Sequence, residues 1–469
     1  MIDKQELLDI LTPVHQEHVL KYWDSLSEES RASLATQIRQ VNWGELEGYI
    51  ASASQTLSPA ELQAITPAPY LPLQPKRGDE MRYEEARAAG EALLRDGKVG
   101  VFTVAGGQGS RLGFAGPKGT FPLSEIKQKT LFQLFAEKLL YIQNKYGRPL
   151  RWYLMTSVAN HADTCAFFAE NGYFGLDAKN IRFFSQGMLP ALDATSHKAL
   201  LAAPDSLALA PNGHGGSFAA LKDSGALDDM KAQGITTITY FQVDNPLVRP
   251  FDPLFLGLHE LTASDMSSRA LIKRDAKEKL GHFCNLNGKT IIIEYSDMPE
   301  ELVQKRDADG QLSFRAGSPA IHLLRRTFVE EITAHALKLP AHSAIKKIPC
   351  LNQEGVLVQP QAPNALKLEF FLFDALPLAK NPLIFEANRE ENFAPVKNAE
   401  GNDSPASSRA ALNARSARLF QQAGLPFPLK ADGTPDAVVE ISERAIQTPQ
   451  ELRHANPPAL HPGDKLYLE

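Results

Sequence analysis

The sequence predicts an α/β fold built on a mixed, mostly parallel sheet. Across the middle of the 469-residue chain, apolar strand-like runs alternate with amphipathic helical stretches. A glycine-rich loop directly follows the first of these runs, and polar residues follow two others. Alternating strands and helices are typical of parallel sheets, which bind ligands at the carboxyl ends of their strands.

The first 75 residues predict a helical region that ends in a linker. Leu7, Leu8 and Ile10 lie at helical intervals, and a Ser-x-x-Glu pattern within residues 25–34 resembles a capping box. Four prolines between residues 67 and 75 exclude a helix there. We therefore expect residues 1–75 to form an N-terminal helical region and an extended, proline-rich linker.

Residues 76–405 predict the main α/β domain, which begins with a helix over 79–95. Its further helices are expected at Thr130–Asn144 and Ala162–Glu170, and its strands at Trp152–Thr156, Ile181–Ser185, Ile238–Val243, Ser268–Lys273 and Ile291–Tyr295. The polar stretch 400–408 predicts a surface loop. A helix over 408–423 and short strands then predict a small C-terminal domain, residues 406–469.

Composition narrows the function class. Hydrophobic residues make up 43% and charged residues 22%, as in soluble globular proteins. The net charge of −6 argues against a nucleic-acid partner. No apolar run approaches the ~18 residues of a membrane span, and three widely spaced cysteines indicate a reducing compartment. We therefore expect a cytoplasmic protein with small-molecule substrates and neither nucleic-acid nor membrane partners.

The loop after the first strand, VFTVAGGQGSRLGFAGPKGTFPL over 101–123, indicates nucleotide binding. Its glycines let the backbone approach a bulky anion, while Arg111 and Lys118 supply positive charge for phosphates. The P-loop pattern is absent because Lys118 is followed by Gly119. The dinucleotide fingerprint fails because Leu112 stands where its third glycine would be.

Three further segments carry candidate groups. Gln186 ends a strand and offers an amide that suits the edge of a base. His214 lies in a second glycine-rich loop, where a general base, a sugar contact and a solvated turn residue remain open alternatives. Asp244 ends an apolar strand and suits Mg²⁺, although an aspartate there can also cap a turn. Lys367 and Lys397 lie beside apolar sequence.

These motifs, in order along residues 15–445, resemble those of the eukaryotic-type UDP-N-acetylhexosamine pyrophosphorylases within the UDP-sugar pyrophosphorylase (uridylyltransferase) family. They are VAGGQGSRLGFAGPKG, FFSQGMLPAL, NGHGG, VDNPLV, EYSDM, IKKIP, LKLEFFLFD and FAPVKNAEGNDSP. The resemblance implies a Rossmann-like nucleotidyltransferase domain between small N- and C-terminal domains. It also implies Mg²⁺-dependent reaction of UTP with a hexose 1-phosphate to give a UDP-sugar and pyrophosphate.

The resemblance also assigns roles. The implied catalytic residues are Arg111, Lys118 and Lys397, which grip phosphates. The implied UTP contacts are Val104, Ala105, Gly106, Gly107, Gln186, Gly213, Asp244 and one of Lys346 and Lys347, with Asp244 also holding the metal. The implied sugar-side residues are His214, Glu294, Tyr295, Ser318 and Lys367.

Two departures leave the sugar open. The N-acetylhexosamine enzymes typically have Gly-Asn-Gly where this chain has Gly213-His214-Gly215, and Ala-Gly-Asn where it has Ala316-Gly317-Ser318. The histidine resembles UDP-glucose members. The chain as a whole therefore points to N-acetylglucosamine 1-phosphate, with glucose 1-phosphate or broad specificity as the alternative. A catalytically silent regulator that binds nucleotide sugars is a non-enzyme alternative, and the broken fingerprint disfavours a dinucleotide oxidoreductase.

Overall fold

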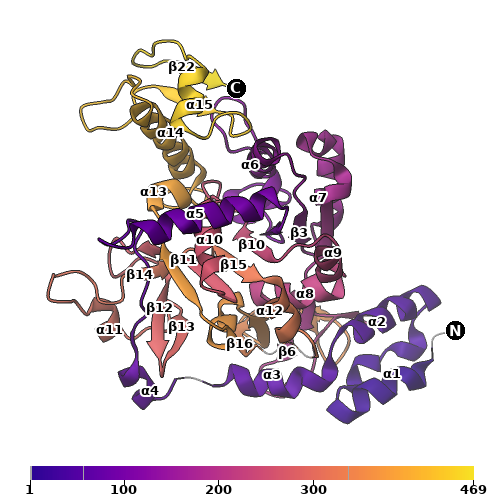
Figure 1. Ribbon diagram of the computed structural model, residues 1–469. Coiled ribbons are helices and arrows are strands. Elements are labelled where there is room, and N and C mark those ends of the chain that lie inside the picture. The colour runs from indigo at the N-terminus through magenta and orange to yellow at the C-terminus, as the bar shows by residue number, and fades with distance from the viewer. Residues whose placement is uncertain (1–2, 56, 336, 338) are drawn as a thin grey trace. The chain divides into compact units, whose positions relative to one another are not determined.

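The computed structural model describes residues 3–55, 57–335, 337 and 339–469. The chain forms two compact units, each assembled from segments far apart in sequence (Figure 1). Unit 1 comprises Met1–Gln63, Gln186–Ala220 and His335–Ala375. Unit 2 comprises Ala64–Ser185, Leu221–Ala334 and Leu376–Glu469. The sequence predicted three consecutive segments, 1–75, 76–405 and 406–469, and these differ from the two units. Whether they are independent domains stays a prediction.

A mixed sheet forms the centre of unit 2, in the order β1-β12-β14-β11-β15-β10-β2-β3-β4, with β13 on β12 and β20 on β11. Strands β10, β2, β3 and β4 run parallel to one another. The strands are β1 (Thr66–Pro67), β2 (Val99–Val104), β3 (Trp152–Thr156), β4 (Ile181–Ser185), β10 (Thr237–Gln242), β11 (Met266–Ile272), β12 (Gly281–Leu286), β13 (Lys289–Ile293), β14 (Ala316–Ser318), β15 (His322–Arg325) and β20 (Leu383–Glu386).

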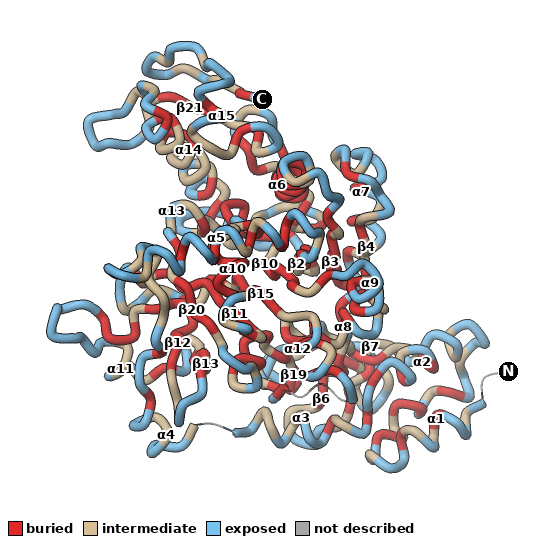
Figure 2. Tube along the Cα trace, viewed as in Figure 1, coloured by how far each residue is buried: buried red, intermediate tan, exposed pale blue. Residues whose placement is uncertain are grey.

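Three of the parallel strands, β2, β3 and β10, are buried on both faces, which explains their largely apolar sequence. All five residues of β3 are buried, and β2 and β10 are buried except for their last residues (Figure 2). Each expected strand is present, and those over 152–156 and 181–185 have the expected bounds. The α/β fold class is confirmed.

Helices pack on this sheet, and glycines set their closest approach. Helix α5 (Glu80–Arg95) crosses α10 (Pro253–Leu261), where a Cβ on Gly257 would lie 1.6 Å from the Ala86 carbonyl oxygen. Helix α6 (Leu131–Tyr146) begins where the Thr130 side chain accepts from the Gln133 amide, and Gly147 ends it in the left-handed conformation. Helix α7 (His161–Glu170) follows β3. All three helices expected in this part of the chain are present.

The C-terminal part of unit 2 has a small apolar core. Helix α14 (Pro405–Gln422) starts with a capping box between Ser404 and Ser407 and confirms the helix expected over 408–423. The parallel pair β21 (Val438–Ile441) and β22 (Lys465–Leu468) and helix α15 (Pro449–His454) complete this part. Their core contains Phe420, Val439 and Leu452.

Unit 1 combines helices α1 (Lys4–Leu11), α2 (Glu28–Gln40) and α3 (Leu46–Ala53) with a sheet in the order β16-β19-β6. These strands are β16 (Ala341–Lys346), β19 (Ala365–Phe370) and β6 (Leu192–Asp193). The sequence pattern predicted Ser25 as the cap of the second helix, and this position is wrong. Ser27 caps α2, because its side chain accepts from the Ser30 backbone amide. Within the described residues, no helix has both the length and the apolarity needed to cross a membrane.

Candidate active site

The glycine loop leaves the end of β2 and closes on itself. The Ala105 amide continues the β2–β3 pairing by donating to the Met155 carbonyl oxygen at 2.7 Å. The Lys118 amide donates to the Gly107 carbonyl oxygen at 3.0 Å, which closes the loop. A Cβ on Gly109 would lie 2.7 Å from the Phe114 ring, so this position needs glycine for packing.

Asn160 anchors the start of the loop, and sequence reasoning missed it. Its amide nitrogen donates to the carbonyl oxygens of Ala105 at 3.0 Å and Gly107 at 3.3 Å, and the residue is 1% exposed. The signal available was its position four residues after β3, a strand whose carboxyl end shares the sheet edge with that of β2.

Four predicted phosphate and metal residues come together in unit 2. Burial lowers the pKa of Lys118, the nearby charges of Lys397 and Arg111 lower it further, and the Asp244 carboxylate opposes them. The Lys118 stem passes Gly107, whose Cβ would lie 4.0 Å from the Lys118 Cε. Lys118 therefore has two further cations and one buried carboxylate near it, a combination suited to a polyanion with a divalent cation.

Backbone contacts bring Asp244 and Lys397 together from distant parts of the chain. The Val396 amide donates to the Asp244 carbonyl oxygen at 2.8 Å. The Asn245 side chain donates to the Asn392 carbonyl oxygen at 2.7 Å and accepts from the Ala394 amide at 3.1 Å. The two motifs VDN and FAPVK therefore form one clamped structure at the carboxyl end of β10.

The sugar-side residues of unit 2 gather around Gly281. Gly281 and Ser318 are paired on β12 and β14, and a Cβ on Gly281 would lie 3.3 Å from the Glu294 Oε1. Because β12 lies between β13 and β14, Ser318 and Glu294 flank Gly281 on the same face of the sheet. Tyr295 follows and is 45% exposed.

In unit 1, Gln186 and the second glycine loop meet. The Gln186 amide nitrogen donates to the Gly213 carbonyl oxygen at 2.7 Å. Gly213 has φ +79°, and a Cβ there would lie 2.4 Å from the Phe370 carbonyl oxygen. Asn212, another residue that sequence reasoning missed, fills the space beside Gly216, whose Cβ would lie 2.0 Å from the Asn212 Oδ1.

His214 is held by the segment after β19. Its Nδ1 accepts from the Leu372 amide at 3.1 Å, and its ring stacks on Phe371 with a centroid separation of 5.4 Å. Burial, helped by the nearby charge of His342, lowers the pKa of His214 to about 4. The neutral ring therefore carries its hydrogen on Nε2, and that donor is what His214 can offer a ligand.

The lysines of unit 1 differ in placement. Because Lys346 pairs with Ala365 and Ala344 pairs with Lys367, Lys346 and Lys367 share one face of the sheet. The Lys367 Nζ also lies 3.4 Å from the Glu369 Oε2. Lys347 follows the last residue of β16. The strand register thus distinguishes Lys346 from Lys347, which the sequence alone could not do.

Comparison with known proteins decides the family. A profile of the UTP--glucose-1-phosphate uridylyltransferase family matches residues 51–427. The chain belongs to this uridylyltransferase family. The mouse UDP-N-acetylhexosamine pyrophosphorylase-like protein 1 is 35% identical over 91% of this chain and 90% of that protein. The Saccharomyces cerevisiae UDP-N-acetylglucosamine pyrophosphorylase is 33% identical over 93% of this chain and 94% of that protein.

Solved structures of the uridylyltransferase family agree. The uridine diphosphate N-acetylglucosamine pyrophosphorylase of Trypanosoma brucei superposes with a TM-score of 0.82, at 25% identity, over 100% of this chain and 98% of that chain. The UDP-glucose pyrophosphorylase of Leishmania major shares the fold, with a TM-score of 0.62 at 16% identity, over 92% of this chain and 88% of that chain. The predicted family and the prediction of a nucleotidyltransferase enzyme are confirmed, while the individual residue roles stay predictions.

Proposed function

We propose that this uridylyltransferase joins UTP to N-acetylglucosamine 1-phosphate, giving UDP-N-acetylglucosamine and pyrophosphate. The observation that carries the proposal is the grouping of Lys118 with Arg111, Lys397 and Asp244, on the loops that follow β2 and β10 and on the segment bonded to Asp244. The relatives' names support the choice of sugar, since several are UDP-N-acetylglucosamine pyrophosphorylases.

The proposed chemistry needs charge and alignment rather than a protein nucleophile. An oxygen of the sugar phosphate forms a bond to the α-phosphorus of UTP. The bond from that phosphorus to the bridging oxygen breaks, and pyrophosphate leaves with the electron pair. Arg111 and Lys118 would neutralise the leaving pyrophosphate, and Lys397 would draw the two reacting phosphates together. Two polyanions repel each other and must be aligned before they react. Cations lower this repulsion and hold the phosphates in one orientation.

Asp244 would hold Mg²⁺ together with the substrate's phosphates. The described residues contain no group of three or more His, Cys, Asp and Glu side chains that could hold a metal alone. A single buried carboxylate still fits Mg²⁺, because this ion is usually bound through one or two carboxylates and phosphate oxygens. When bound, it supplies further neutralisation of phosphate charge.

The remaining proposed contacts are to the uridine, the uracil base and the sugar phosphate. Val104 to Gly107 would hold uridine and ribose, and the Gln186–Gly213 pair would read uracil. Lys346 is the preferred phosphate contact of the lysine doublet because it shares a face with Lys367, which would contact the sugar phosphate.

A second candidate, UDP-glucose or broad UDP-sugar synthesis, rests on His214 and Ser318. His214 offers a donor from Nε2, whereas an asparagine amide would offer a donor and an acceptor. An acetamido group left without its partner would cost ~1–3 kcal/mol, enough to change the preferred sugar.

We place the reaction in the cytoplasm, which the three free cysteines support.

The test is pyrophosphate release from UTP with N-acetylglucosamine 1-phosphate, glucose 1-phosphate and galactose 1-phosphate in parallel, each product confirmed by mass. The proposal expects the highest kcat/KM with N-acetylglucosamine 1-phosphate. A higher value with glucose 1-phosphate would establish the second candidate. Tight binding of a UDP-sugar without pyrophosphate release from any substrate would show the regulator instead.

A further inference from the structure

Lys138 is a buried cation behind the candidate site. It lies on α6, and 3% of its side chain is exposed. Its Nζ donates to the carbonyl oxygens of Pro246 and, at 2.8 Å, Val248. Both carbonyls belong to the turn directly after Asp244 and Asn245. Lys138 therefore supports from behind the backbone that carries the candidate metal carboxylate.

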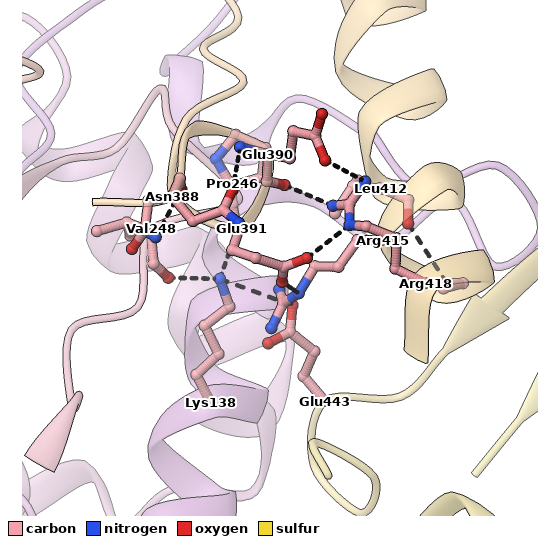
Figure 3. A network of polar contacts seen from close by, with 12 residues as sticks. Lys138, Pro246, Val248, Asn388, Glu390, Glu391, Leu412, Arg415, Arg418 and Glu443 are labelled. Carbon is pink, nitrogen blue, oxygen red and sulfur yellow. Dashed lines mark hydrogen bonds and ion pairs between the residues drawn. The ribbon is translucent and has the colours of Figure 1, made fainter. Parts of the chain in front are cut away.

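A series of ion pairs between buried and partly buried side chains leads from Lys138 to the segment before Lys397 (Figure 3). The Lys138 Nζ lies 3.6 Å from the Glu443 Oε1, which pairs with Arg415 at 3.0 Å. Arg415 pairs with Glu391 at 3.3 Å. We call Lys138, Glu443, Arg415 and Glu391 the Lys138 ring.

The ring closes through the site itself. Glu391 precedes Asn392 on α13 (Arg389–Asn392), and the Asn392 carbonyl oxygen accepts from the Asn245 side chain at 2.7 Å. Asn245 directly precedes Pro246, which holds the Lys138 Nζ. The contacts thus run from the Asp244 turn through the C-terminal part of unit 2 to the Lys397 segment and back.

Stability alone is a poor explanation for this arrangement. Removing charges from water costs several kcal/mol per ion, and buried ion pairs are often replaceable by apolar residues without loss of stability. The geometric effect is specific, however, because the two ends of this series of contacts reach the site: Lys138 bonds the turn after Asp244, and Glu391 lies in the segment before Lys397. Polar networks of low exposure tend to hold the chain in one arrangement when their groups are bonded.

The same C-terminal part also holds the segment after Lys118. The Arg409 Nε donates to the Leu123 carbonyl oxygen at 2.7 Å. The Glu440 carboxylate accepts from the amides of Ile126 at 2.7 Å and Lys127 at 2.9 Å. The C-terminal part therefore contacts the segment after Lys118 and the segment before Lys397, and it reaches the turn after Asp244 through Lys138.

We infer that Lys138, Glu443 and Arg415 are positioning residues, which fix the Asp244 carboxylate and the Lys397 ammonium relative to each other. This inference rests on the proposed function for its effect on rate. Phosphoryl transfer depends on alignment, and a displacement of about 1 Å can cost about 100-fold in rate. These three side chains would thereby affect the rate without touching substrate.

The kinetic test compares Glu443→Gln with Leu452→Ala. Leu452 is fully buried in the C-terminal core and has no part in the ring, so it controls for lost stability. We expect Glu443→Gln to lower kcat about tenfold to 100-fold and to change the KM for UTP less than about threefold. Leu452→Ala, with an equal or larger loss of Tm, should keep kcat within about twofold of wild type. A Glu443→Gln kcat no lower than that of Leu452→Ala would overturn the inference.

Hydrogen exchange tests the ring independently of activity. The amides of Val396 and Ala394 bond to Asp244 and Asn245, so they report the clamp directly. Their exchange should rise about tenfold in Glu443→Gln and in Lys138→Met, but not in Leu452→Ala. Unchanged exchange in both ring variants would also overturn the inference. A wild-type protein that releases no pyrophosphate would refute the proposed function, and the exchange result would still decide the ring.

Discussion

The buried charge of Lys138 predicts a pH-dependent stability that can be calculated. Burial lowers the pKa of Lys138 from 10.5 to about 8, while Glu443 acts in the opposite direction. Between these two pH values the unfolded chain holds a proton on Lys138 that the folded chain has lost. The free energy of unfolding therefore rises with pH across this window and shows no slope from this group below about pH 8.

The magnitude follows from the size of the shift. One pKa unit corresponds to about 1.4 kcal/mol, so the full window is worth roughly 3 kcal/mol. Replacing Lys138 with methionine removes this contribution and keeps the apolar stem. The charged groups acting on Lys138, namely Glu443, Arg415 and Arg249, remain in the variant. Relative to Lys138→Met, the wild type should therefore gain stability between pH 7.5 and pH 10.

The assay is urea unfolding at several pH values, followed by intrinsic fluorescence, to which the buried Trp152 contributes from unit 2. Lys145→Met, which alters an exposed lysine on the same helix, is the matched control and should run parallel to wild type. If the wild-type and Lys138→Met stabilities also run parallel from pH 7.5 to pH 10, burial does not lower the pKa of Lys138 and the reasoning fails.

Three further predictions concern packing, the glycine loop and the sugar. Gly257→Ala should destabilise by about 1–3 kcal/mol, because its Cβ would lie 1.6 Å from the Ala86 carbonyl oxygen; Gly48→Ala, with no atom within 4 Å, is the control, and equal Tm values for the two variants would contradict the packing. Asn160→Ala removes the side-chain donor to the Ala105 carbonyl and leaves the Gly107 carbonyl only the Lys118 amide, so the KM for UTP should rise about fivefold in initial-rate measurements. An unchanged KM would show that the loop keeps its shape unaided. His214→Asn should move the ratio of kcat/KM for N-acetylglucosamine 1-phosphate over glucose 1-phosphate by about 5-fold to 150-fold, toward the acetamido sugar. A ratio within twofold of wild type would remove His214 from sugar selection.

Local sequence patterns predicted the strands and loops that carry the site in unit 2. Strand β3 is an almost continuous apolar run, and Asp244 and the glycine loop follow β10 and β2 as expected. Such features depend on neighbours in sequence, which is why they can be read from it. The cap at Ser27 shows the limit, since two serines of that stretch precede the helix and only the backbone geometry distinguishes them.

Long-range contacts could not be predicted in the same way. Nothing local joins Asn245 to Asn392 and Ala394, because 147 and 149 residues separate the partners. The Lys138 ring had one weak signal, the charged pair Glu137–Lys138 within the apolar sequence of α6. Lys346 and Lys347 became distinguishable only when strand register was known, since a shift of one residue exchanges the faces of a strand.

The central claim is that the cations around Asp244 perform uridylyl transfer, and Lys118 tests it most directly. The measurement is the rate of pyrophosphate release from UTP and N-acetylglucosamine 1-phosphate by wild type, Lys118→Ala and Lys179→Ala, whose lysine side chain is 77% exposed. The account predicts that the wild type and Lys179→Ala both release pyrophosphate. It predicts that the kcat of Lys118→Ala is at least about 100-fold lower than that of the wild type. A Lys118→Ala variant with wild-type turnover would contradict it.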